Sequence, residues 1–198
     1  MAVPFAETLP AGRASLWQFA LYEARSAEKW RSLNRLDLGL AEGLELGVLL
    51  ISPHDRPSDT WINLQYRPFK ETLYRPVLSV GVWDMGRKAG PWFSDKKTGA
   101  SPFLSLGKTL QRGDQFLKLG LSYGSNRLQG LFGGGDLRFL RHTGIQVEYA
   151  PENLRLPGTE AWDVGLYRWI GKHWRARVSR MGGNPMLDVF FTYDLSAK

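Results

Sequence analysis

The sequence contains no cysteine and no long apolar run. Without cysteine, the chain can form neither a disulfide framework nor a thiolate metal site. A transmembrane helix needs about 20 consecutive, mostly apolar residues, and the longest apolar run here covers only residues 48–51. These absences exclude a small disulfide-stapled fold and a helical membrane protein.

The first residues also lack the features of a secretory signal peptide. Residues 1–6 (MAVPFA) contain neither a basic segment nor an apolar run of the required length. The chain is therefore either cytosolic or a mature exported chain with an added initiator Met. We expect the second, because the strand pattern described below is typical of an exported envelope protein.

Aromatic residues, glycines and short apolar stretches are abundant. The 198 residues fit one domain, and 43% hydrophobic with 23% charged residues excludes a disordered chain. Aromatics make up 13%, including eight Trp, and there are 22 Gly, which together favour an all-β fold with frequent turns. The net charge of +7 by itself indicates a nucleic acid or an anionic membrane surface as a partner.

The dominant pattern is a strict alternation of apolar and polar residues. In residues 35–40 (RLDLGL) the three leucines share one face, and Arg35, Asp37 and Gly39 share the other. This alternation recurs along the chain and predicts a transmembrane antiparallel up-and-down β-barrel of about 12 strands, an all-β fold. We expect residues 1–14 to be an N-terminal periplasmic lead-in and residues 15–198 a single β-barrel domain. The expected strands cover 15–24, 31–41, 43–52, 59–69, 75–86, 101–110, 115–124, 127–140, 143–150, 160–170, 173–181 and 186–195.

The connections between these strands alternate in length. Tight turns are expected at 41–43, 70–74, 111–114, 140–143 and 171–172. Longer links are expected at 25–30, 52–58, 86–100, 150–159 and 181–185, with a tight turn at 124–126 as the exception. Short periplasmic turns and longer external loops are typical of outer-membrane barrels, and an even strand number places both barrel ends of the chain on the periplasmic side.

Alternation alone does not decide whether the apolar face points into a soluble core or outward into lipid. The polar face carries recurring glycines and nearly balanced charges, which fit a narrow lumen where small residues make room for large ones and charges pair. We therefore predict an apolar outside and a charged lumen. The predicted lumen charge network consists of Arg35, Asp37, Glu45, Arg67, Asp84, Lys118, Asp136, Arg138, Glu148, Asp163, Arg175, Arg177 and Asp188.

Aromatic residues gather near the predicted strand ends, as in the interfacial girdles of membrane barrels. The predicted interface aromatics are Trp17, Tyr66, Tyr123, Tyr149, Trp162, Trp174 and Tyr193. Because the lumen charges nearly cancel, the surplus positive charge falls in turns and loops, including Arg87, Lys88, Lys96 and Lys97 in the longest link. We expect contact with outer-membrane lipid and lipopolysaccharide, and no nucleic-acid partner.

Motifs for catalysis or metal binding are weak. His54, His142 and His173 have no second ligand at metal-site spacing, and residues 130–135 (GLFGGG) lack the ending of a phosphate loop. We expect no catalytic residue, no metal site and no cofactor. Two alternatives stay open: an outer-membrane enzyme acting on lipid or lipopolysaccharide, with His54 as a candidate, and a soluble β-barrel that binds an apolar ligand.

Two motifs resemble those of YjbH-like outer-membrane β-barrel proteins. Residues 36–48 (LDLGLAEGLELGV) resemble a hairpin of that family, and residues 130–134 (GLFGG) followed by 147–149 (VEY) resemble a later section. The opening at residues 4–12 is similar to their mature N-termini, so the resemblance covers about residues 4–150. It implies an outer-membrane location and a link to exopolysaccharide or capsule secretion. YjbH-like proteins are much longer, which weakens the implied polysaccharide role.

Overall fold

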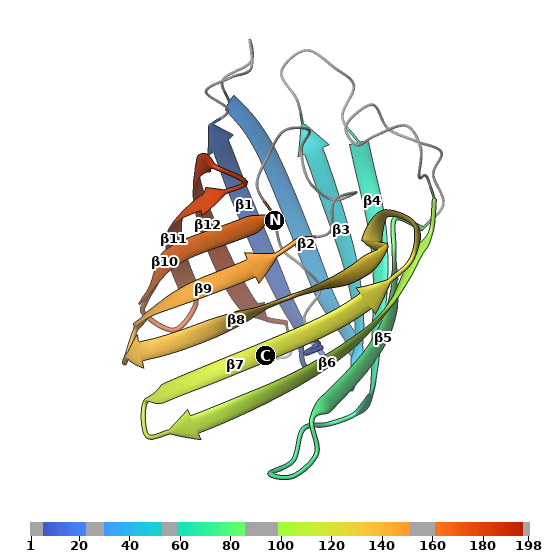
Figure 1. Cartoon of the computed structure of the whole chain (residues 1–198), viewed down its shortest axis with the longest axis horizontal. Helices are drawn as coiled ribbons and strands as arrows, with labels where there is room; N and C mark the ends of the chain where they lie inside the picture. Colours follow the sequence, from blue (N-terminus) through green and yellow to red (C-terminus); the bar gives the residue numbers. More distant parts are fainter. Residues whose placement is uncertain (1–5, 23–29, 53–58, 86–98, 151–160, 196–198) are drawn as a thin grey trace.

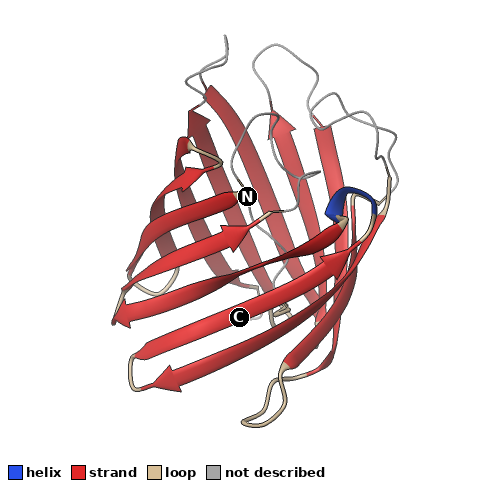
Figure 2. Ribbon diagram, in the orientation of Figure 1, coloured by secondary structure: helices blue, strands red, loops and turns tan. Residues whose placement is uncertain are grey.

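The computed structural model describes residues 6–22, 30–52, 59–85, 99–150 and 161–195. Within them, twelve strands and one short 3-10 helix follow one another along the chain (Figures 1 and 2). The elements are β1 (Arg13–Tyr22), β2 (Trp30–Ala41), β3 (Leu44–Ser52), β4 (Asp59–Phe69), β5 (Val77–Trp83), β6 (Ser101–Arg112), β7 (Gln115–Gly124), η1 (Asn126–Leu128), β8 (Gly130–Leu140), β9 (Thr143–Tyr149), β10 (Trp162–Ile170), β11 (Trp174–Met181) and β12 (Asn184–Asp194).

The strands form one closed barrel in which each strand pairs antiparallel with its sequence neighbours. β1 closes the barrel by pairing with both β2 and β12, so that Ser15 lies opposite Asp37 on one side and Thr192 on the other. Closure leaves no free sheet edge. The predicted all-β, antiparallel, up-and-down barrel of about 12 strands is confirmed.

The largest differences from the predicted strands are three residues, at the end of β5 (Trp83 instead of 86), where Asp84 has φ 56°, and at the start of β8 (Gly130 instead of 127). Residues 126–128 form η1 instead of the start of a strand, because Asn126 (φ 53°) and Gly130 (φ 102°) leave the extended conformation. The expected long link at 181–185 is a two-residue turn of Gly182 and Gly183, both with positive φ. Glycine adopts this conformation without steric strain, so the strands can turn more tightly than expected.

One end of the barrel, called the turn end, holds the β2–β3, β4–β5, β6–β7, β8–β9 and β10–β11 connections, together with the start of β1 and the end of β12 (Figure 1). Gly43, Gly113 and Gly171 have positive φ there, as tight hairpin turns require. The opposite end is called the loop end. The predicted long links at 25–30, 52–58, 86–100 and 150–159 belong to the loop end and lie largely outside the described residues.

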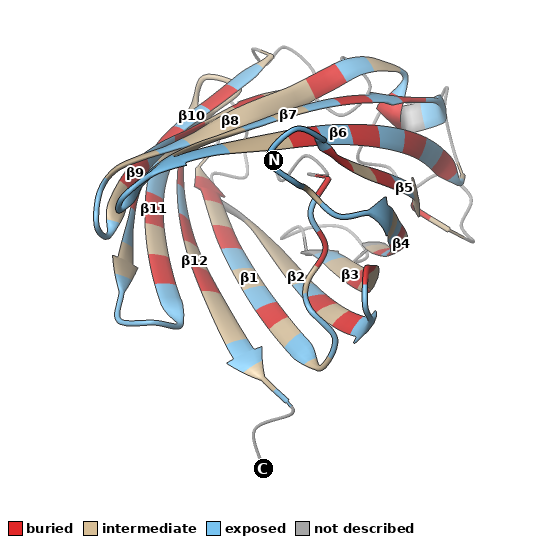
Figure 3. Cartoon of the chain, turned by 90° about the horizontal axis from the view of Figure 1, so that it is seen from below, coloured by how far each residue is buried: buried red, intermediate tan, exposed pale blue. Residues whose placement is uncertain are grey.

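Buried and exposed residues alternate along the strands (Figure 3). Most of the buried strand positions that carry charge or polarity face the interior, and the exposed large hydrophobic residues face outward. In β10 the outward Val164 and Leu166 are about half exposed, whereas the inward Asp163 and Tyr167 are buried. A soluble barrel would bury its leucines and expose its charges, so this orientation argues against the soluble alternative. The described residues include no helix with the length and apolar character needed to cross a membrane.

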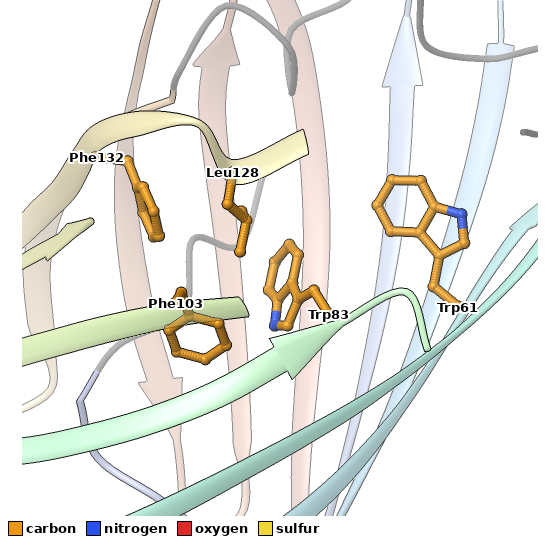
Figure 4. Packing of buried hydrophobic residues seen from close by; sticks show 5 residues of the cluster. All are labelled: Trp61, Trp83, Phe103, Leu128 and Phe132. Atoms are coloured by element: carbon orange, nitrogen blue, oxygen red, sulfur yellow. The ribbon is translucent and has the colours of Figure 1, made fainter. Parts of the chain in front are cut away.

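The interior is filled differently along its length. Near the loop end, Trp61, Trp83, Phe103, Leu128 and Phe132 form an apolar cluster inside the barrel, beside η1 (Figure 4). A glycine on the neighbouring strand makes room for this cluster, because a Cβ at Gly81 would lie 2.5 Å from the Phe103 ring. A second buried apolar cluster contains Phe19, Leu21 and Met186. The charged groups occupy further parts of the interior.

Candidate functional site

The first charged group of the lumen, on β2 and β3, is centred on Arg35. Its Nε donates a 2.7 Å hydrogen bond to Asp37 Oδ1, and its Nη2 lies 3.6 Å from Glu45 Oε1. Ser15 on β1 donates a further 3.3 Å hydrogen bond to Asp37 Oδ2. Alternation places Arg35 and Asp37 two residues apart on the same face of β2, and the β2–β3 register brings Glu45 beside them.

The second charged group, on β9 to β12, is centred on Arg177, which is 1% exposed. Its Nε donates to Asp188 Oδ2 at 2.5 Å, and its Nη1 lies 3.4 Å from Asp163 Oδ2. Gln146 accepts a 3.4 Å bond from Arg177 and donates a 2.7 Å bond to Glu148. The guanidinium is thus held from three neighbouring strands, which makes this the most enclosed ion-pair group among the described residues.

The other predicted lumen residues are spread along the barrel. Lys118 pairs with Glu7 at 2.5 Å, and Asp136 accepts a 2.6 Å hydrogen bond from Tyr167. Asp84 is buried at the end of β5, where its backbone N–H donates to Asn63. Arg138 lies over the Phe116 ring.

Arg67 lies near the turn end and pairs at 3.1 Å with Glu42 of the β2–β3 turn. Lys70 lies 3.0 Å from the same Glu42 carboxylate. The hydrogen bond from Lys70, followed by the charges of Lys70 and Arg67, holds the pKa of Glu42 below its ordinary value. Sequence reasoning did not include Glu42, because a turn residue gives no alternation signal.

Arg175 differs from the other buried arginines of the lumen. It is 6% exposed, and its Nε and Nη2 have no hydrogen-bond partner within the described part of the chain. Four aromatic rings surround its guanidinium carbon, at 4.6 Å (Trp17), 5.2 Å (Tyr167), 5.2 Å (Phe190) and 6.0 Å (Trp169). Cation–π contacts therefore hold this charge in place of an ion pair.

Residues 6–12, ahead of β1, fold into the barrel from the turn end (Figure 3). The Leu9 N–H donates to Glu45 Oε2 at 2.8 Å, and Glu7 crosses to Lys118 on β7. Gly39 allows this path, because a Cβ there would collide with the Pro10 carbonyl oxygen. Part of the predicted 1–14 lead-in therefore lies inside the lumen. Its location on the periplasmic side of the membrane stays a prediction.

A cavity of about 250 Å³ adjoins this segment inside the barrel. Glu7, Thr8 and Leu9 line one side of it, and Trp17, Gln65 and Phe190 contribute to the rest. The charged lining from the strands consists of Arg35, Asp37, Glu45, Lys118, Asp136, Glu148 and Arg175. Seven of the thirteen predicted network residues therefore meet at one cavity, which is the candidate functional site.

The predicted interface aromatics lie on the outer face, with one exception. Tyr66, Trp174 and Tyr193 lie toward the turn end, and Tyr123, Tyr149 and Trp162 toward the loop end. Tyr149 and Trp162 form an edge contact at 5.1 Å on neighbouring strands.

Trp17 is the exception, and its predicted place at the membrane interface is wrong. Trp17 shares the inner face of β1 with Ser15 and Phe19, and its ring lies 4.3 Å from that of Phe190. Residues 14–21 (ASLWQFAL) mix apolar residues on both faces, so alternation gave the wrong side there.

Two of the three histidines lie away from the lumen site. His142 and His173 are exposed in turn-end connections, and the His173 ring lies 6.2 Å from that of Phe191. His54 and the basic group Arg87, Lys88, Lys96 and Lys97 lie outside the described residues.

Comparisons with known proteins relate the fold to outer-membrane barrels. No family model and no curated protein match the sequence. The COG4313 outer membrane channel from Pseudomonas putida F1 has a similar structure, with a TM-score of 0.50 and 12% identity, covering 97% of this chain and 98% of that one. A triple mutant of the Rhodopseudomonas blastica porin aligns with a TM-score of 0.38 and 11% identity over 82% of this chain and 55% of that one, too low to support an argument. The first likeness shows the fold alone, and the YjbH-like resemblance rests on its sequence motifs.

Proposed function

We propose that this chain is a bacterial outer-membrane barrel, without enzymatic activity, that acts in envelope transport or polysaccharide secretion. The observation that carries the proposal is the orientation of the two faces, with half-exposed leucines outside and buried ion pairs around a cavity inside. Its proposed partners are membrane lipid and lipopolysaccharide outside, and a polysaccharide or a secretion-system protein at the lumen.

In this proposal the barrel rests in a closed state. Residues 6–12 occupy the turn end of the lumen, held by the Leu9–Glu45 hydrogen bond and the Glu7–Lys118 ion pair. The Arg35–Glu45 and Arg177–Asp188 ion pairs link neighbouring strands and fill further interior space. A solute can pass only when the N-terminal segment leaves its position, so we expect low ion conductance from the resting protein.

Planar-bilayer recording tests this proposal with one variant and one matched control. Gly39→Val should raise the conductance several-fold, because the valine side chain takes the position of the Pro10 carbonyl and displaces residues 6–12. Valine is β-branched and therefore suits the strand itself. Gly135→Ala should leave conductance unchanged, because its Cβ would lie 3.3 Å from the Leu119 side chain, away from residues 6–12.

Two results would contradict the closed resting state. A large steady conductance from the unmodified protein would indicate an open porin. Unchanged low conductance in Gly39→Val would show that residues 6–12 do not control passage. The outer-membrane location has a separate test, since a protein that stays monodisperse without detergent would overturn it.

A further inference from the structure

Two arginines on β11 point into the lumen two residues apart, yet their surroundings differ. Arg177 is neutralised by Asp188 and Asp163. Asp188 is therefore already engaged by Arg177, and Arg175 is left with aromatic rings instead of an oxygen acceptor within the described residues. Stacking satisfies the faces of a guanidinium and leaves its in-plane N–H donors unused.

Arg175 borders the lumen cavity, while its unpartnered Nε and Nη2 are themselves buried beneath the rings. Arg175 lines the cavity together with Trp17 and Phe190, the rings that fix its position. A buried cationic donor without an acceptor is unfavourable, and a bound oxygen atom relieves that penalty. The guanidinium fork fits a carboxylate with two parallel hydrogen bonds. A carboxylate that enters the cavity can form this pair once the Arg175 side chain turns its buried nitrogen atoms toward it.

The remaining lining restricts which acids fit. The cavity is bordered by five carboxylates (Glu7, Asp37, Glu45, Asp136 and Glu148) and only three cations (Arg35, Lys118 and Arg175). Arg35 and Lys118 are already paired, so a simple anion would meet an excess of negative charge. A ligand that also carries hydrogen-bond donors can turn these toward the carboxylates.

We propose that the cavity binds a small hydrophilic carboxylic acid that also carries hydroxyl or ammonium donors, with its carboxylate on Arg175. A volume of about 250 Å³ suits a monosaccharide-sized solute. This inference deepens the proposed transport role by naming the class of solute. Binding and conductance are measured separately, so either proposal can fail while the other stands.

Isothermal titration calorimetry on the detergent-solubilised full chain tests the inference. The probes are sodium D-glucuronate, with hydroxyl donors, and L-serine, with an ammonium donor, against D-glucose and inorganic phosphate as comparison ligands. At least one of the two acids should bind, and Arg175→Gln should weaken its affinity at least tenfold. Arg138→Gln is the matched control and should bind normally, because Arg138 does not line the cavity.

Arg175→Lys keeps the charge but loses the fork, and should lie between the wild type and Arg175→Gln. It also provides the test if Arg175→Gln does not fold, which heat-dependent gel mobility would reveal. The inference is overturned if neither acid binds, if binding ignores both Arg175 substitutions, or if glucose binds as tightly as the acids. Arg175-dependent phosphate binding of equal strength would also overturn it, since the site would then accept any small anion.

Discussion

The inner and outer faces of the barrel are formed by the same strands, yet the side chains on the two faces need different contacts. On β10, Asp163 and Tyr167 point inward and are buried, while Val164, Leu166 and Ile170 point outward and are about half exposed or more. Outside, a side chain needs only to be apolar, because lipid makes no specific contacts. Inside, each polar group needs a particular acceptor or donor. The two faces should therefore respond differently to the same kind of substitution.

The largest effect is expected inside, at the Arg177 ion-pair group. Arg177→Met leaves Asp188 (0% exposed) and Asp163 (4% exposed) without their cation. Breaking one side of a buried ion pair costs about 3–5 kcal/mol in the free energy of unfolding. Urea unfolding in lipid vesicles, followed by tryptophan fluorescence, measures this loss. Arg112→Met, at the exposed end of β6, is the control, and equal small losses in both variants would contradict the comparison.

The next effect is expected outside, and it should depend on position along the strand. Leu166→Arg places a charge near the middle of β10 on the outer face, which costs about 2–4 kcal/mol at a bilayer midplane. Ile170→Arg makes a closely similar change on the same face at the strand end, where the cost falls to about 0–1 kcal/mol. The same vesicle unfolding assay measures both. If the two variants lose equal stability, the outer face does not contact a bilayer in the proposed position.

The smallest effect is expected at the turn end, where the ion pairs face water. The lowered pKa of Glu42 means that its contacts with Lys70 and Arg67 stabilise the fold above the ordinary carboxyl range. This contribution disappears as the pH falls through the lowered pKa, because the carboxylate is then protonated. Glu42→Gln should thus lower the unfolding midpoint slightly at pH 7 and match the wild type in acid. A difference that grows on acidification would contradict this assignment.

Most of the barrel could be predicted from the sequence, because alternation has a direct physical cause in the pleat of a strand. Most predicted strands agree with the structure to within two residues at each end, and the largest shifts occur beside Asp84 and Asn126, the two non-glycine residues with positive φ within the described part of the chain. Alternation also placed six of the seven interface aromatics on the outer face. It failed at Trp17, where apolar residues occur on both faces of β1.

The cavity could be predicted only in part. Seven of its lining residues belong to the predicted lumen charge network, since one face of each strand must meet the interior. Pairing within that network depends on the register between strands, which alternation does not specify. The contrast between Arg175 and Arg177, two residues apart on one strand, therefore has no sequence signal.

The position of residues 6–12 inside the lumen also could not be predicted from the alternation of apolar and polar residues. Gly39 and Gly107 recur on the inner face, and each makes room for this segment: Gly39 for Pro10 and Gly107 for Ala6. A glycine indicates that something approaches closely, but it does not identify what approaches. Residues 6–12 themselves show no alternation that would connect them with either strand.

The pairing of β1 with β12 has a consequence for the order of assembly. Residues 13–21 lie opposite residues 186–194, so the seam joins the first part of the chain to the last. Such distant pairing is slow to form, and until it forms both strands present open edges. The barrel cannot close before β12 has been synthesised. The residues ahead of β1 that contact Glu45 and Lys118 reach their final surroundings only when β12 arrives.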